Sequence, residues 1–240
     1  MWGLYALRQT DNEDAPDEQV AARLISERFS CRRFLPEPVP HQTIERLLSL
    51  AQMTASCCNS QPWQVLVTEG EATERFRSAI YEYASQPGVK LDTDIDHKHD
   101  YPGVYKERRR DCGIQLYESI GIPRHDREAG ERQRLENFRF FGAPHVALVT
   151  SEAALGTLGA IDCGAWLSNF LVAATSLGVA AVPQASLSMY AKFTRAFFGI
   201  PDNRWLLFGI SFGYADHEHP ANQFRSRRAP LSEVATFVSE

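Results

Sequence analysis

The sequence has few cysteines, and they follow no pattern that would pair them or bind a metal. Its 240 residues contain five cysteines, of which Cys57 and Cys58 are adjacent, and no Cys-x-x-Cys. This usage excludes a disulfide framework and favours a reducing compartment. The start of the chain also lacks a charged leader followed by an apolar run, so we expect a cytoplasmic protein.

Long apolar runs and an excess of positive charge are missing as well. No stretch approaches the roughly 20 consecutive apolar residues that span a bilayer, so we expect no membrane segment. The formal net charge is −5 at pH 7. An acidic chain has no general attraction for nucleic acid or anionic lipid, and we therefore expect no nucleic-acid partner.

What is present is the composition of an ordinary globular protein. Hydrophobic residues make up 44% of the chain and charged residues 23%, which allows a sizeable core. The chain has no internal repeat and no low-complexity tract. We predict a single domain over residues 1–240, whose first segment, through about Pro16, is a polar, aperiodic arm.

Hydrophobic periodicity predicts the main elements. Helical spacing begins at Asp17, recurs from Ile44 to Ala51, and returns in a long apolar helix that contains Ile161 and Ala174. Short apolar runs predict strands over residues 64–68, 145–150, 179–185 and 205–213. Within the third strand, Pro183 is expected to stop the pairing and to leave the backbone N–H groups of Gln184 and Ala185 free.

Residues 95–140 are polar and helical in pattern, and we predict that they form a helical insertion over the core. Asp96-His97-Lys98-His99-Asp100 resembles a metal-binding loop in composition. The lysine between the histidines opposes cation binding, so a solvated loop is favoured and no metal site is predicted. The run Arg108-Arg109-Arg110 lies beside acidic residues, which is typical of an exposed helix face.

A polar turn, Ser56 to Trp63, joins the second helix to the first strand. It offers amide and hydroxyl groups with nothing local to satisfy them, which favours a binding turn. The alternative is a capped loop whose Trp63 plugs the core. A second segment, Arg28 to Phe34, combines arginine and serine after a helix, a combination that suits a phosphate.

Five segments in this order resemble the FMN-dependent nitroreductase superfamily. They are Arg28-x-Ser30-x-Arg32, Ser56-x-x-Asn59-x-Gln61-Pro62-Trp63, Gly178 to Gln184, Gly209 to Tyr214, and Arg225 to Leu231. The resemblance runs from about residue 20 to 235, apart from the insertion. It implies an α+β sandwich with a mostly antiparallel central sheet flanked by helices, in an interlocked homodimer whose two FMN sites each use both subunits.

The resemblance also implies a set of cofactor-binding residues. In it, Arg28, Ser30 and Arg32 hold the phosphate together with Arg228 and Arg225, the Ser56 turn comes from the other subunit, and residues 183–185 lie along the isoalloxazine. The full set is Arg28, Phe29, Ser30, Arg32, Ser56, Asn59, Gln61, Pro183, Gln184, Ala185, Arg225 and Arg228. Arginine forks match phosphate oxygens, and backbone donors near the ring steady its reduced form.

The implied activity is an NAD(P)H oxidoreductase that reduces nitroaromatic or similar electron-poor aromatic compounds by a ping-pong mechanism, with no side chain as essential acid or base. Tyr101 and Tyr105 are expected to stack on the substrate, while the phenylalanines at 138, 140 and 141 either stack or pack the insertion on the body. No Gly-x-Gly-x-x-Gly selects between NADH and NADPH.

Two questions stay open at the level of sequence. Other flavin chemistry is possible on the same scaffold, namely reductive dehalogenation, azoline oxidation, flavin destruction or non-catalytic flavin binding. The adjacent Cys57 and Cys58 are interpreted as compact fillers of the turn, because nothing cationic nearby in sequence lowers their pKa.

Overall fold

The computed structural model describes residues 16–96 and 100–239. The predicted N-terminal arm, except its last residue, and His97, Lys98 and His99 lie outside the described residues. The described helices are α1 Asp17–Glu27, α2 His41–Ala51, α3 Glu71–Ala84, α4 Gly103–Ser119, α5 Arg127–Leu135, α6 Gly156–Ser176 and α7 Ala191–Phe198, and the strands are β1 Trp63–Thr68, β2 His145–Glu152, β3 Ala180–Gln184 and β4 Arg204–Gly213.

The four strands form one antiparallel sheet in the order β1-β2-β4-β3. The central strands β2 and β4 are nearly continuous apolar runs, and every residue of β2 except Glu152 is buried. Strands that are covered on both faces have largely apolar sequences, because neither face meets water. The predicted α+β fold with an antiparallel sheet flanked by helices is confirmed.

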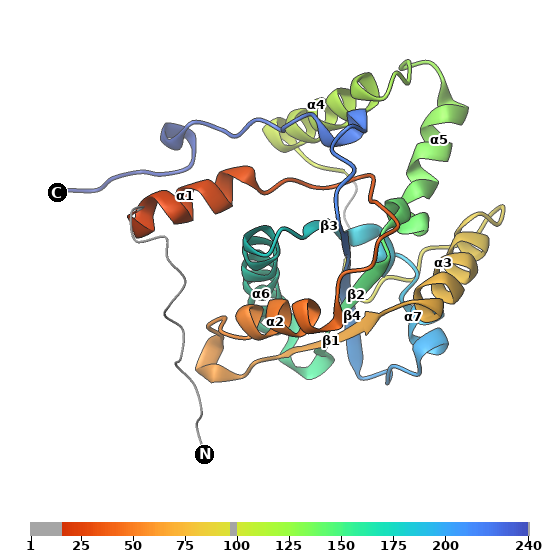
Figure 1. Ribbon diagram of the computed structural model, residues 1–240, viewed down its shortest axis with the longest axis horizontal. Helices are drawn as coiled ribbons and strands as arrows, with labels where there is room; N and C mark the ends of the chain where they lie inside the picture. Colours follow the sequence, from red (N-terminus) through yellow and green to blue (C-terminus); the bar gives the residue numbers. More distant parts are fainter. Residues whose placement is uncertain (1–15, 97–99, 240) are drawn as a thin grey trace.

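Helices cover both faces of this sheet (Figure 1). Helices α2 and α6 pack on one face and α3 and α7 on the other. Alternate residues of β2 point to opposite sides, so that Ala147 and Val149 join the first cluster while Val146 and Leu148 join the second. Side chains of the single strand β2 therefore contribute to two hydrophobic cores, one on each face of the sheet.

Helix α6 is apolar on two sides. By length and composition, Ala153–Ser176 could cross a membrane, but Trp166 and Phe170 on its inner side are fully buried against the sheet and α2. Its outer side carries Leu158 and Ile161, which are 60% and 61% exposed. This is a core helix with an apolar face that nothing in the described chain covers, and such faces are typical of interaction sites.

The expectation that Pro183 stops its strand is wrong. β3 continues through Pro183, which pairs with Ile210, to Gln184, which pairs with Gly209. Because β3 is the last strand of the sheet, a residue without an N–H is tolerated there. Gly209 of β4 lies close to the side chain of Leu187, which follows β3, so a Cβ at this position would clash with it.

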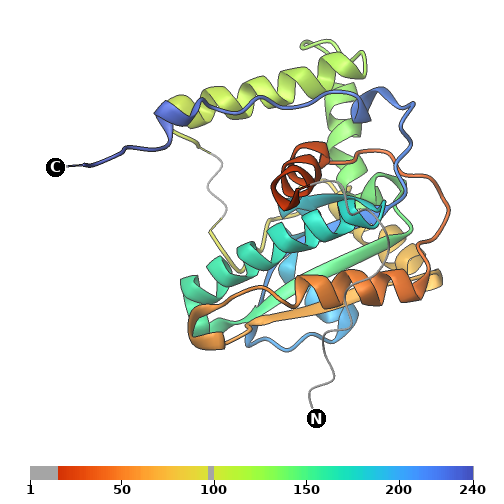
Figure 2. The same ribbon diagram turned by 60° about the vertical axis from the view of Figure 1, so that its left-hand side comes forward.

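The rim of the molecule differs from its body. Helices α1, α4 and α5 contain no buried residue, and α4 runs beside the chain that follows β4 (Figure 2). Arg108 of α4 ion-pairs with Glu233 of that chain at 2.8 Å. The predicted insertion is helical, and Phe138, Phe140 and Phe141 at its end are buried in the second core, so they pack the insertion on the body.

Candidate functional site

The site begins where α1 ends. Arg28 leaves helical geometry with φ −57° and ψ 128°, and the chain then runs along the outer edge of β3. Ser30 bridges Ala181, and the Cys31 N–H donates to the Ala181 carbonyl at 3.1 Å. The edge of the sheet therefore fixes the backbone that presents Arg28, Ser30 and Arg32.

The chain that follows β4 returns to the same place. Arg225 lies over the ring of Phe29, with its Cζ 4.2 Å from the centroid, and Arg32 lies over Phe224 at 5.7 Å. Each segment thus supplies an aromatic ring to an arginine of the other, and such contacts hold a guanidinium without neutralising it. Two sequence-distant arginine clusters thus lie side by side.

Asn222 joins these two segments, and sequence reasoning missed it. Its Oδ1 accepts the Arg32 N–H at 2.7 Å, and its Nδ2 donates to the carbonyls of Arg33 and Asp216 at 2.8 and 2.7 Å. Its own carbonyl accepts from Arg225 Nη1 at 2.7 Å. No periodicity or motif marks Asn222, because Arg32 and Arg33, which it joins to its own segment, lie 190 and 189 residues away in sequence.

A cavity of about 460 Å³ lies between the two segments. It is lined by Ile25, Ser26, Arg28, Phe29, Ser30, Arg32, Cys112, Phe224, Arg225, Ser226 and Arg228. Four of these eleven residues are arginines, and Ser30 and Ser226 add hydroxyl groups. We call the arginines at 28, 32, 225 and 228 the arginine cradle.

The cradle is a cluster of like charges. The pKa of Arg28 is lowered, first by burial and then by the neighbouring Arg228 and Arg225. Burial also lowers the pKa of Arg32. Over residues 16–96 and 100–239, no ion pair with a carboxylate involves a cradle arginine. Cations gathered in this way are stabilised by an anion from outside the chain.

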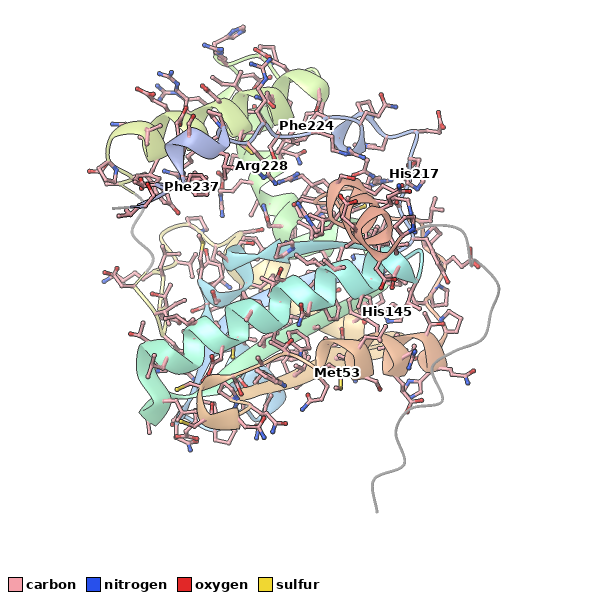
Figure 3. The ribbon with its side chains drawn as sticks, turned by 90° about the vertical axis from the view of Figure 1, so that its left-hand side faces the viewer. Met53, His145, His217, Phe224, Arg228 and Phe237 are labelled. Atoms are coloured by element: carbon pink, nitrogen blue, oxygen red, sulfur yellow. The ribbon has the colours of Figure 1, made fainter. Side chains whose placement is uncertain are left out.

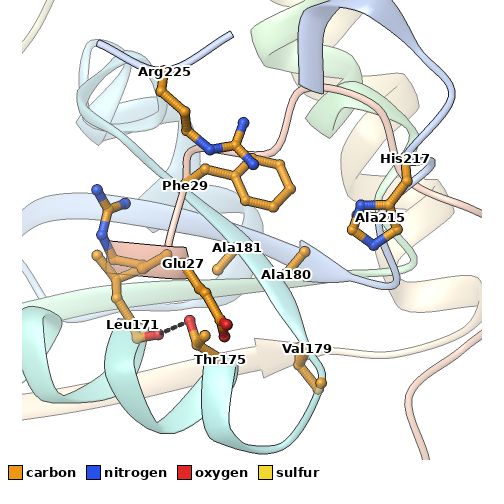
Figure 4. Close-up of a pocket in the computed structure, with 12 residues that line it drawn as sticks. Glu27, Phe29, Leu171, Thr175, Val179, Ala180, Ala181, Ala215, His217 and Arg225 are labelled. Carbon is orange, nitrogen blue, oxygen red and sulfur yellow. Dashed lines mark hydrogen bonds between the residues drawn. The ribbon is translucent and has the colours of Figure 1, made fainter. Parts of the chain in front are cut away.

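A second cavity, of about 520 Å³, shares Phe29 with the first (Figure 4). Its walls include Leu171 and Thr175 of α6, Ala181 of β3, and His217. Arg225 and Phe29 line both cavities, as does Arg28. A charged hollow therefore adjoins a more apolar one, an arrangement that suits a ligand with an anionic end and a larger uncharged part.

Several polar groups of the turn have nearby partners, which corrects the expectation that nothing local satisfies them. Ser56 Oγ accepts the Gln61 N–H at 3.0 Å, and Gln61 Oε1 accepts from Gln52 Nε2 at 2.9 Å. Gln52 also accepts the indole N–H of Trp63 at 2.8 Å. Trp63 is buried and packs in the first core, so the plugging role of its ring is confirmed.

The turn and the cradle do not meet within one chain. Asp162 of α6 holds the turn, while Thr175 of the same helix lines the second cavity. A rise of 1.5 Å per residue places these two helix positions about 20 Å apart. Figure 3 shows Met53, which precedes the turn, and Arg228 on opposite sides of α6.

The remaining predicted site residues are placed as follows. Gln184 is buried, and its side chain contacts Ser211 and donates to the Asn137 carbonyl at 2.8 Å. Its amide is therefore part of the core, and Ala185 next to it is exposed. Tyr101 and Tyr105 are exposed, Tyr101 lies under Arg109 at 5.4 Å, and neither tyrosine lines the two cavities.

Comparison with known proteins identifies relatives over most of the chain. A profile described as the Nitroreductase family matches residues 25–214. The chain is 39% identical to nitroreductase NfnB of Mycolicibacterium smegmatis, over 91% of this chain and 93% of that protein. It is 34% identical to a chloronitrobenzene nitroreductase of Comamonas testosteroni, over 90% and 96%.

A solved structure agrees with these sequence relatives. The crystal structure of the FMN-dependent nitroreductase NfnB from Mycobacterium smegmatis, in complex with NADPH, superimposes with a TM-score of 0.88. The two chains are 38% identical, and the alignment covers 92% of this chain and 99% of that one.

Proposed function

Because this chain belongs to the nitroreductase family, we propose that it is an FMN-dependent NAD(P)H oxidoreductase that reduces nitroaromatic or similar electron-poor aromatic compounds. The observation that carries this proposal is the arginine cradle, four cations in a cavity that no carboxylate lines, beside a second hollow whose lining includes Leu171, Ala181 and Glu27.

The residues present fit FMN. Its phosphate carries close to two negative charges, and arginine forks bind such oxygens in pairs. We assign the phosphate to Arg28, Ser30 and Arg32, with Arg225 and Arg228 closing the cradle. The proposed ring contacts are the backbone at Pro183, Gln184 and Ala185, since the Gln184 amide is held by the core, and Phe29 stands between the two cavities.

When bound, FMN would supply the hydride and two-electron redox chemistry that links NAD(P)H to the second substrate. The chain positions both substrates in turn over one face and stabilises charge. The residues we assign to the cofactor site are arginines, hydroxyls and amides, so we assign no side chain as an essential acid or base. Turnover should therefore be ping-pong.

Steady-state kinetics test this mechanism. Initial rates against NADPH at several concentrations of a nitrobenzoate should give parallel double-reciprocal lines, and so should rates with NADH if it is used. Intersecting lines would show separate sites and contradict the shared pocket. Rapid loss of iodide from a halophenol with negligible nitro reduction would move the function to dehalogenation, and a colourless protein that FMN cannot reconstitute would exclude a flavoenzyme.

We further propose a homodimer in which each cofactor site uses both subunits. The uncovered face of α6 around Leu158 and Ile161 offers an apolar interface, and Phe237 near the end of the chain is 84% exposed. The separation of the turn from the cradle within one chain is then bridged across the dimer, because Ser56, Asn59 and Gln61 of one subunit approach the partner's cradle.

Subunit complementation tests this arrangement. Arg28→Ala and Asn59→Ala are each expected to weaken FMN binding in their own homodimers. After subunit exchange, a mixed dimer contains one site with both changes and one intact site, so mixing should restore FMN binding and activity. If the site lay within one chain, every site would keep one defect and mixing would restore nothing. Light scattering that finds a flavin-loaded monomer would exclude the dimer.

We propose that residues 95–140 act as a lid within a single 1–240 domain, with Tyr101 and Tyr105 contacting the aromatic substrate. Both tyrosines are exposed beside the cationic face of α4, so they are free to stack. Tyr105→Ala should raise the KM for the nitro substrate more than the KM for NADPH. We also propose a cytoplasmic location, because all five cysteines are free thiols.

A further inference from the structure

Two adjacent thiols stand out on the polar turn. The Sγ atoms of Cys57 and Cys58 lie 4.0 Å apart, and both residues are exposed in the chain. In the single chain both thiols are open to reagents, and their interpretation as compact fillers stays a prediction. The other three cysteines differ: Cys31 and Cys163 are buried, burial raises the pKa of each to about 12, and Cys112 is half-buried.

The backbone around the pair is fixed. The Cys57 N–H donates to Asp162 Oδ2 at 3.1 Å, and the Cys57 carbonyl accepts the Ser60 N–H at 3.0 Å. Cys58 has a positive φ of 50°, and Asn59 follows at 56°. Left-handed geometry is costly for such residues and persists where the surroundings enforce it, so the two thiols are held side by side.

We propose that Cys57 and Cys58 form a chelating site for a trivalent arsenical that carries one organic group. Thiolates select soft, thiophilic centres, and an arsenic atom with one organic substituent needs two sulfur ligands to complete its bonding. Zinc normally requires four ligands, and the described residues contain no group of three or more His, Cys, Asp or Glu that could hold a metal.

The binding reaction is balanced without a redox step. An organic arsenous acid, R–As(OH)2, reacts with the two S–H groups, forms two As–S bonds and releases two water molecules. The second bond closes inside the molecule, so its effective concentration is high. The pKa of Cys57 is raised by its hydrogen bond to Cys58 and by repulsion between two neighbouring thiolates, a repulsion that a shared arsenic centre removes.

A disulfide between the same cysteines is disfavoured as the resting form. The described chain has no cis peptide bond, and neighbouring Cα atoms across a trans peptide are about 3.8 Å apart. Disulfides normally span about 4.4–6.8 Å between Cα atoms, and strained ones are easily reduced. The open dithiol is therefore the form that meets ligands in a reducing compartment.

Thiol titration with phenylarsine oxide tests the site in the full-length, FMN-loaded protein. One equivalent per chain should remove two thiols from the count of reactive thiols in the native protein. The ligand should be released by 2,3-dimercaptopropanol and resist an excess of 2-mercaptoethanol. Equal release by the two reagents would show single-thiol reaction and overturn the proposal.

Matched variants locate the ligand. Cys58→Gly removes one thiol and fits the positive φ, and Cys57→Ser is nearly isosteric; each should weaken arsenical binding about a hundredfold or more because the chelate is lost. Cys112→Ser should bind as the parent does. Unchanged affinity in both Cys58→Gly and Cys57→Ser, or loss of binding in Cys112→Ser, would contradict the assignment.

A second readout separates this proposal from the proposed function. Only one part of the proposal rests on that function, namely the position of the cysteine pair beside the partner's cofactor. If the turn borders that site, bound phenylarsine oxide should block nitro reduction while the flavin absorbance stays. Full activity with the arsenical bound would uphold the thiol site and exclude the turn from the active site. Binding and thiol loss are measurable even in protein that holds no FMN.

Discussion

The chain places arginines in two kinds of surroundings, at the sheet and at the cradle. Near the sheet, Arg204 is buried and donates to Thr150 Oγ1 and its carbonyl at 2.9 Å and to the Pro62 carbonyl at 3.1 Å. Arg195 is buried and ion-pairs with Asp94. In the cradle, Arg28 instead faces Arg225 and Arg228.

This difference in partners distinguishes arginines that stabilise the fold from arginines that are available to bind a ligand. A buried arginine whose charge or hydrogen bonds find partners inside the chain stabilises the fold, and its removal leaves those partners unsatisfied. An arginine that faces other arginines is destabilised in the free protein and gains its partner when an anion binds. Stability and cofactor affinity should therefore respond to different substitutions.

The largest effect is expected at the sheet. Arg195→Met leaves Asp94 without its buried counter-charge, and should lower the free energy of unfolding by about 3 kcal/mol. Thermal unfolding at fixed protein concentration should then shift down by roughly 6–12 °C. Adding Asp94→Asn removes the orphaned charge and should recover part of the loss. If Arg195→Met were as stable as the parent, the ion pair would not stabilise the fold, and Arg195 would belong with the arginines that lack an internal partner.

At the cradle, Arg28→Ala should act on the ligand and leave the scaffold intact. A charge-assisted contact to phosphate contributes about 1.5–3 kcal/mol, so FMN affinity should fall about tenfold to a hundredfold while flavin-free protein unfolds at the parent temperature. Arg227→Ala is the matched control, since Arg227 lies in the same segment but lines neither cavity. Equal FMN dissociation constants for the two variants would remove Arg28 from the cradle.

Asn222 lies between the two cases, because it is satisfied internally yet positions the cradle. Asn222→Ala leaves the Arg32 N–H and the Arg33 carbonyl without this partner, which should cost about 1.5 kcal/mol of stability. FMN affinity should fall by less than in Arg28→Ala. Titration calorimetry with FMN and urea unfolding measure the two effects; a change in affinity alone would make Asn222 a direct ligand.

The smallest effect concerns His145, a buried histidine whose ring can make both of its hydrogen bonds only while it is neutral. His145 Nε2 accepts the Val39 N–H at 2.9 Å, its Nδ1 lies 3.3 Å from the Thr68 carbonyl, and Phe212 stacks on its ring at 5.1 Å. Burial lowers the pKa of His145 below its ordinary value. Below about pH 6.5 the unfolded chain takes up a proton that the folded chain resists.

Stability should therefore be fully present above about pH 6.5 and fall as the pH drops, by at most about 1.4 kcal/mol per pH unit for this group. Urea unfolding at pH 7.5, 6.5 and 5.5 measures the slope. His145→Gln, which keeps an acceptor for Val39, should show a shallower slope at a lower starting stability. Identical slopes would assign the acid sensitivity to other groups.

The elements of the fold follow closely from local pattern. The spacing of Ile44, Leu47 and Ala51 predicts α2, and all three are buried. Apolar runs predict all four strands, with β1 and β4 each beginning one residue earlier than expected. These features are readable because the periodicity of a helix or strand is set by its own backbone.

Strand pairing and the position of single side chains are harder to predict from the sequence, because they depend on neighbours in the tertiary structure. Pro183 reads locally as a stop, yet it is tolerated because β3 has a free side, a property of strand order. Asn222 gains its role from residues that meet it only in the folded chain. The two arginine clusters were predicted to converge only through the family resemblance.

The path of the segment after α1 also bears on solubility. The last strand of an open sheet exposes unpaired backbone groups that another chain can extend by strand addition. Here Ser30 and Cys31 cover that side of β3 at Ala181, and the same segment carries the cradle. Anything that holds this segment in place also shields the sheet from its neighbours, so flavin-depleted protein should self-associate sooner on storage than flavin-loaded protein.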